Sequence, residues 1–112
     1  MKILYLTLKG KWYDMIASGE KPEEYRDLKP FWVKRLTNGI KEYKSEYCLN
    51  GIGYEVDWKV FTHVTFARGG HFHPSLPQMT IPLKNIEIGK GNPSWGAELG
   101  KEYFVIKLSI AN

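Results

Sequence analysis

The stretch ILYLTLKGKWYDMIASGEKPEEYRDL, residues 3–28, decides the fold of this chain. Its first six residues are apolar or β-branched in a short run, which predicts a buried strand. From 9 to 18 the apolar residues recur at helical spacing, and Gly19 follows where a left-handed C-cap is favoured. Because Pro22 disfavours helix at the residue before it, 23–28 is predicted to be a second strand. The chain therefore opens as strand, helix and strand.

The remainder of the chain is predicted to be rich in strands. Pro30 is well placed as the first residue of another short helix, which Asn38-Gly39 would close. The segment 39–57 has a weak pattern and is predicted to be a loop with at most one short element. Three further strands are predicted at 60–67, at 79–88 with a bulge near Lys84-Asn85, and at 103–110.

These elements predict an α+β fold that is mostly β, with one domain over residues 1–112. The two short helices fall in the N-terminal third, so an alternating parallel βα architecture is not expected. We expect a small β-barrel or strongly curved sheet of about five to six strands.

Composition limits the classes of function. The chain is 43% hydrophobic and 14% aromatic, which predicts a folded protein. No stretch approaches the roughly 18 apolar residues of a membrane span, and the single Cys48 fits a reducing compartment, so a cytoplasmic protein is expected. The net charge of +4 would attract an anionic partner such as a phosphate backbone.

A charged decapeptide, SGEKPEEYRD at 18–27, holds the candidate site. Gly19, Lys21, Glu24 and Arg26 have the spacing G-x-K-x-x-E-x-R. On a strand, Glu24 and Arg26 share a face, and Lys21 at a glycine-capped turn can reach the same carboxylate. The residues alone leave open whether this is a surface ion-pair network or a functional site at the edge of a cleft.

The motif and its setting resemble the ASCH family of PUA-like domains. LTLKGKWYDMIASGEKPEEYR is similar to the N-terminal strand, helix and strand of that family, and IEIGKGNPSWGAELGKEYFVIKL to its C-terminal half in phage-type and bacterial members. The resemblance implies a PUA-like barrel that binds RNA or a nucleotide-like ligand. The residues it implies for binding, with neighbours that could stack on a base or extend the surface, are Lys21, Glu24, Arg26, Tyr25, Trp32, Lys9, Lys11, Lys34, Arg35 and Arg68.

The resemblance also implies an alternative function. Some bacterial proteins similar to this family are amidohydrolases that remove the acetyl group from 4-acetylcytidine, with a lysine matching Lys21 as nucleophile or general base. Lys21 and Glu24 would then be catalytic. This sequence has Glu24 where those enzymes have threonine, and their later glutamate has no clear counterpart here.

Other chemistry-bearing residues are interpreted as structural. His71 and His73 have only the distant His63 as a third ligand, so no metal site is expected, and no cofactor. Trp95 is predicted to cover the core rather than to stack on a ligand. The sequence leaves the oligomeric state open.

Overall fold

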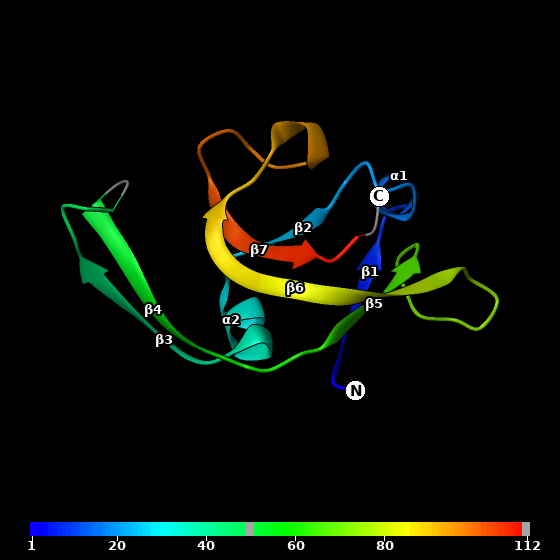
Figure 1. Cartoon of the computed structure of the whole chain (residues 1–112), viewed down its shortest axis with the longest axis horizontal. Helices are drawn as coiled ribbons and strands as arrows, with labels where there is room; N and C mark the ends of the chain where they lie inside the picture. The colour runs from blue at the N-terminus through cyan, green and yellow to red at the C-terminus, as the bar shows by residue number, and fades with distance from the viewer. Residues whose placement is uncertain (49–50, 111–112) are drawn as a thin grey trace. The chain divides into compact units, whose positions relative to one another are not determined.

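The computed structural model describes residues 1–48 and 51–110 (Figure 1). Seven strands and two α-helices lie within these residues. In chain order, with a 3₁₀ turn at Pro93–Trp95, they are β1 (Ile3–Leu8), α1 (Gly10–Ala17), β2 (Glu23–Asp27), α2 (Pro30–Leu36), β3 (Thr37–Lys44), β4 (Ile52–Trp58), β5 (His63–Arg68), β6 (Gln78–Lys90) and β7 (Glu102–Leu108). The chain divides into two compact units, Met1–Arg26 with Phe61–Asn112, and Asp27–Val60.

The first unit is built on a five-stranded sheet in the order β1-β5-β6-β7-β2. β1 runs parallel to β5, while β6 is antiparallel to both β5 and β7. The long β6 bends strongly (Figure 1), and its register shifts between Leu83 and Asn85, at the predicted bulge. Bending curls the sheet into a half-barrel, which confirms the mostly-β, barrel-like prediction. β1 and β2 are left as its two edge strands.

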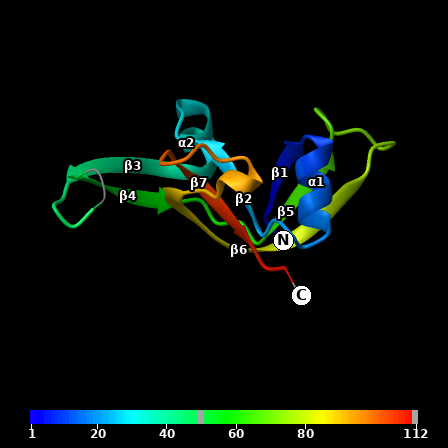
Figure 2. The same ribbon diagram turned by 90° about the horizontal axis from the view of Figure 1, so that it is seen from above.

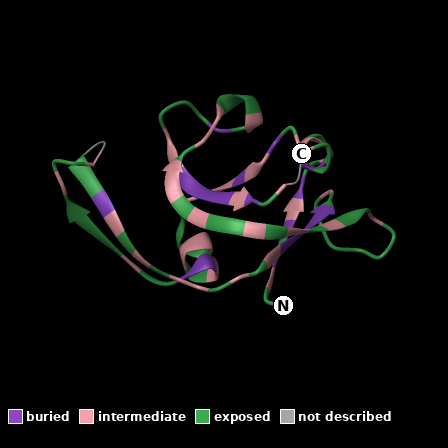
Figure 3. Cartoon of the chain, in the orientation of Figure 1, coloured by how far each residue is buried: buried purple, intermediate pink, exposed green. Residues whose placement is uncertain are grey.

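Apolar side chains are buried along the strands of this sheet and beneath the first helix. Buried residues gather on β5 and β7 (Figure 3), and α1 lies beside β1 and β5 (Figure 2). The helix contributes Tyr13 and Ile16, two of the apolar residues that recur at helical spacing. Each such side chain contributes about 1.5–3 kcal/mol when removed from water. The side chains with at most 2% exposure in the sheet are Leu4, Leu6, Val64, Phe66, Ala67, Phe104, Val105 and Ile106.

The second unit corrects two predictions. The segment 39–57 was predicted to be a loop with at most one short element, but β3 and β4 pair as an antiparallel hairpin on either side of residues 49–50, which lie outside the described residues. Asn38-Gly39 do not close α2, which ends at Leu36, because both residues already belong to β3. Gly53 weakened the sequence signal, yet it suits the strand, since a Cβ there would lie 2.4 Å from the ring of the paired Tyr43. The Tyr43 ring covers Gly53 and occupies the space of the side chain that the glycine lacks. The strand therefore forms without the apolar alternation that predicts strands from sequence.

Most of the other predicted boundaries are confirmed within two residues. An exception is β5, which begins at His63 rather than at 60, because Val60 is exposed and the Thr62 amide donates to the carbonyl of Lys2. Both α-helices lie in the N-terminal third, as predicted, and the five strands of the curled sheet agree with the predicted five to six, while β3 and β4 form a two-stranded sheet of their own. Among the same residues, no helix has the length and apolar character needed to cross a membrane.

Candidate functional site

A tight turn after α1 sets the direction of the Lys21 side chain. Gly19 has φ of 84°, the left-handed conformation predicted for the helix C-cap. The Lys21 amide then donates to the carbonyl of Met15 at 3.0 Å, which folds the chain back onto the end of the helix. Pro22 follows, and its carbonyl accepts from the Leu108 amide at 2.9 Å. These two hydrogen bonds hold the backbone at Lys21 and at the residue after it. The side chain of Lys21 is fully buried, at 0% exposure.

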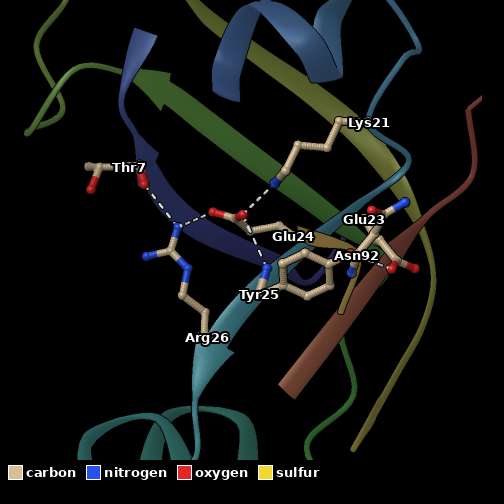
Figure 4. Close-up of polar contacts among 7 residues, drawn as sticks. All are labelled: Thr7, Lys21, Glu23, Glu24, Tyr25, Arg26 and Asn92. Carbon is tan, nitrogen blue, oxygen red and sulfur yellow. Dashed lines mark hydrogen bonds and ion pairs between the residues drawn. The ribbon is translucent and has the colours of Figure 1, made fainter. Parts of the chain in front are cut away.

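Lys21, Glu24 and Arg26, which we call the charged cluster, converge as the sequence predicts (Figure 4). Glu24 lies between the two cations. Its Oε1 accepts from Lys21 Nζ at 2.6 Å, and its Oε2 accepts from Arg26 Nη2 at 2.9 Å. The side chains of Glu24 and Arg26 are 10% and 17% exposed. The cluster is therefore a largely desolvated network rather than a surface ion pair.

Two aromatic rings flank the ammonium group of Lys21. Its Nζ lies 5.5 Å from the ring centroid of Trp12 and 5.5 Å from that of Tyr25. Both distances are within the range of a cation–π interaction. The positive charge of Lys21 is thus buried, and it is surrounded by the carboxylate of Glu24 and by the faces of two aromatic rings.

Arg26 also links the two open edges of the curled sheet. Its Nη2 donates to the backbone carbonyl of Thr7 at 2.9 Å (Figure 4). Thr7 lies on β1 and Arg26 on β2, the first and last strands of the sheet order. The charged cluster therefore sits at the seam where the half-barrel would close, and a side chain replaces part of the missing backbone ladder.

A segment between β6 and β7, Gly91–Glu98, packs against the same two rings; we call it the strap. A Cβ at Gly91 would lie 2.8 Å from Cε1 of Tyr25, and one at Gly96 would lie 3.0 Å from Cζ2 of Trp12. The buried Ala97 packs in a cluster that includes Tyr25. The strap thus lies against the aromatic walls of the Lys21 site.

Tyrosine hydroxyls hold both ends of the strap. The Asn92 amide donates to Tyr25 Oη and the Glu98 amide to Tyr103 Oη, each at 2.9 Å, and the two tyrosine rings are 5.6 Å apart. Tyr25 donates its own proton to Glu23 Oε1 at 2.5 Å. Burial raises the pKa of Tyr25, and the bond to Glu23 raises it further, although the Asn92 amide acts in the opposite direction.

The other predicted ligand residues lie in different settings. Lys9 is exposed at the N-cap of α1. Arg68 forms a bidentate ion pair with Asp14, with both nitrogen–oxygen distances at 3.1 Å, which lowers the pKa of that carboxyl and raises that of the guanidinium. Trp32 belongs to the second unit, where its ring meets Phe31 at 4.9 Å and Arg35 at 5.9 Å. The structure therefore brings together Lys21, Glu24, Tyr25 and Arg26, while these contacts of Arg68 and Trp32 are made elsewhere.

His73 and Trp95 lie in the connections that precede and follow β6. Nδ1 of His73 accepts from the Ser75 amide at 3.1 Å, so that nitrogen is engaged by the loop itself. Among residues 1–48 and 51–110, no group of three or more His, Cys, Asp or Glu side chains is arranged to hold a metal ion. Trp95 is half-buried on the 3₁₀ turn of the strap.

Sequence reasoning missed three participants in the site. Trp12 is one of the apolar residues that recur at helical spacing from 9 to 18, and its position about two turns before Gly19 was the available signal. Asn92 precedes Pro93, which is typical of a cap, and its side chain does accept from the Ser94 amide at 2.9 Å. The bond from its own amide to Tyr25, like the acceptor role of Thr7, depends on tertiary structure and leaves no local signal.

Comparison of the chain with family models, with curated proteins and with solved structures finds no match in any of the three.

Proposed function

We propose that the chain is an ASCH-type, PUA-like domain of the cytoplasm that recognises RNA or a modified nucleoside at the charged cluster. The observation that carries the proposal is the fully buried Lys21, held by Glu24 at 2.6 Å. Burying an ion pair costs desolvation energy, and apolar side chains of similar volume usually stabilise a fold at least as well. A desolvated cluster at the seam of a sheet is thus better explained by recognition than by stability.

The three residues divide the work of recognition. Glu24 accepts hydrogen bonds from both cations and from the Tyr25 amide, so we assign it the role of positioning residue. Arg26 has the most exposed side chain of the cluster, and its planar guanidinium suits a phosphate or a base edge. Lys21 supplies a second positive charge from its buried position beside Glu24.

The surrounding charge favours a polyanion. Lys9 and Lys11 are exposed at the start of α1, the helix that carries Trp12. Arg68 contributes less, because Asp14 neutralises it. Together with the net charge of +4, these groups would attract a phosphate backbone before any base is recognised.

The test is a binding measurement by fluorescence anisotropy, with labelled single-stranded RNA, plain or carrying modified cytidines, over a series of salt concentrations. Arg26→Ala is expected to weaken binding about tenfold and to lower the salt dependence, whereas Lys84→Ala, which removes an exposed charge from β6, should change affinity little. Equal affinities of both variants and the unmodified protein would remove the charged cluster from the binding site.

One observation favours a second function. Lys21 Nζ and Glu24 Oε1 are 2.6 Å apart, close enough to exchange a proton in a desolvated site. Such a pair suits hydrolysis of an acylated cytidine, in which water attacks the acyl carbon, the carbon–nitrogen bond breaks, and the released amine takes up a proton. Mass spectrometry would detect cytidine and acetate from 4-acetylcytidine, and turnover should be absent in Lys21→Ala. No turnover by the unmodified protein would exclude this substrate.

A further inference from the structure

Lys21 cannot meet a ligand while the first unit keeps this arrangement, because its side chain has no exposed surface. The rings of Trp12 and Tyr25 lie on the ammonium group, and the strap lies on those rings. Access to Lys21 therefore requires that the strap and at least one ring move.

We propose that the strap, Gly91–Glu98, is a gate over Lys21, held shut at its two ends by the hydroxyls of Tyr25 and Tyr103. This rests on the proposed function in one respect, that the ligand entering the open site is RNA or a modified nucleoside. The opening itself is a property of the fold.

The attachments of the strap within the described residues are few. Its amides at Asn92 and Glu98 donate to the two tyrosine hydroxyls, and its buried apolar residue is the small Ala97. Other bonds stay inside the strap, such as those from the Trp95 and Ala97 amides to the Asn92 carbonyl, or reach only just beyond it, as the Lys101 amide does when it donates to the Glu98 carbonyl. A segment that is held together internally and attached weakly at its ends can move as one body.

Glycines supply the pivots. Gly96 and Gly100 have φ of 98° and 81°, which places left-handed backbone within the strap and after it. Gly91, at the other end, is the residue whose missing Cβ lets the chain pass between Tyr25 and Ala97. Small residues at both ends can absorb the change in backbone angles that opening needs.

The test combines pulse labelling of lysines with hydrogen exchange. Acetic anhydride is applied briefly to the folded chain, and mass spectrometry then compares acetylation of Lys21 with that of the exposed Lys90. Tyr25→Phe and Tyr103→Phe each remove a strap hydrogen bond and keep the ring. Because one hydrogen bond is worth about fivefold in an equilibrium constant, each variant should raise the rate at Lys21 about fivefold. Tyr47→Phe, at a residue that is 91% exposed, should leave it unchanged.

Exchange is measured at the end of the strap opposite to each substitution. Tyr25→Phe should speed exchange of the Glu98 amide, and Tyr103→Phe that of the Asn92 amide, by the same factor as the labelling. Exchange on β7 should stay constant. Unchanged labelling in both variants would overturn the gate. So would a rise at Lys21 matched by an equal rise across β7, since that would mean global unfolding.

The gate and the proposed function fail separately. If labelling and exchange respond as expected but no RNA or modified nucleoside binds to any variant, the gate stands and the assigned ligand is wrong. If RNA binds through Arg26 while the labelling rate of Lys21 is unchanged in Tyr25→Phe and in Tyr103→Phe, recognition stands and the gate is wrong. If both hold, Tyr103→Phe should bind RNA about fivefold faster than the unmodified protein, because more of it is open.

Discussion

Replacement of Glu24 by glutamine is the most informative single change, because it removes one charge and keeps the shape. The neutral amide would leave the Lys21 ammonium at 0% exposure without its counter-ion. Removing one partner of a buried pair costs about 3–5 kcal/mol. The ammonium keeps its contact with the ring faces of Trp12 and Tyr25, each 5.5 Å away. This cation–π attraction, roughly 0.5–2 kcal/mol, leaves the charge partly compensated and places the cost at the lower end of that range. We therefore expect Glu24→Gln to lower the free energy of unfolding by about 3 kcal/mol.

Urea denaturation followed by tryptophan fluorescence measures this loss. With a slope of about 1.5 kcal/mol per molar urea, a loss of about 3 kcal/mol moves the midpoint by about 2 M. The matched control is Lys21→Met, which removes the buried cation and leaves Glu24 with Arg26 at 2.9 Å. It should cost only about 1 kcal/mol. The double variant should be more stable than Glu24→Gln alone, by about 2 kcal/mol, because the fully buried cation is no longer present.

The reasoning would be refuted by a Glu24→Gln protein within about 0.5 kcal/mol of the unmodified one. That result would mean that water reaches Lys21 in solution. Simple additivity in the double variant would refute it too, since two groups 2.6 Å apart in a dry site must depend on each other.

Three further predictions follow from contacts elsewhere in the first unit. The raised pKa of Tyr25 means that the folded chain keeps the phenolic proton longer than the unfolded chain, so this stabilisation is complete below pH 10.0 and declines above it; Tyr25→Phe should flatten the alkaline loss of stability in a pH series of urea titrations. Asp14→Asn should lower stability slightly at low salt and not at all in about 1 M salt, because Asp14 and Arg68 are both exposed; persistence of the loss in salt would contradict this. Gly91→Ala should lower the melting temperature, at a cost of about 1–3 kcal/mol, since its Cβ would lie 2.5 Å from Ala97; a neutral result would show that the strap yields freely.

Local signals in the sequence were sufficient for several features of the first unit. Gly19 as a helix cap, the strand at 23–27 and the bulge near Asn85 each depend on a few neighbouring residues, and all three are present. The charged cluster was predictable for the same reason. Glu24 and Arg26 are two apart on a strand, so they had to share a face.

The features that could not be predicted are those that depend on pairing or packing between segments rather than on a local pattern. The β3–β4 hairpin was not predicted, because its pairs combine Tyr43 with Gly53 and Lys41 with Glu55. These pairs break the apolar alternation that predicts strands. The burial of Lys21 was also not predictable. It depends on Trp12 and on Tyr25, whose place is fixed in turn by a bond from Asn92, 67 positions along the chain.

The order of the strands determines when the site can form. β2 carries Glu24 and Arg26 within the first quarter of the chain, yet its neighbour in the sheet is β7, the last strand. Lys21 and its partners thus emerge early during synthesis and have no edge to pair with until Glu102–Leu108 has followed. Their assembly is a late, long-range event, in which the loop between β2 and β7 closes after the local elements are in place. Until then the cations of the cluster remain in water, and their desolvation coincides with the final step of folding.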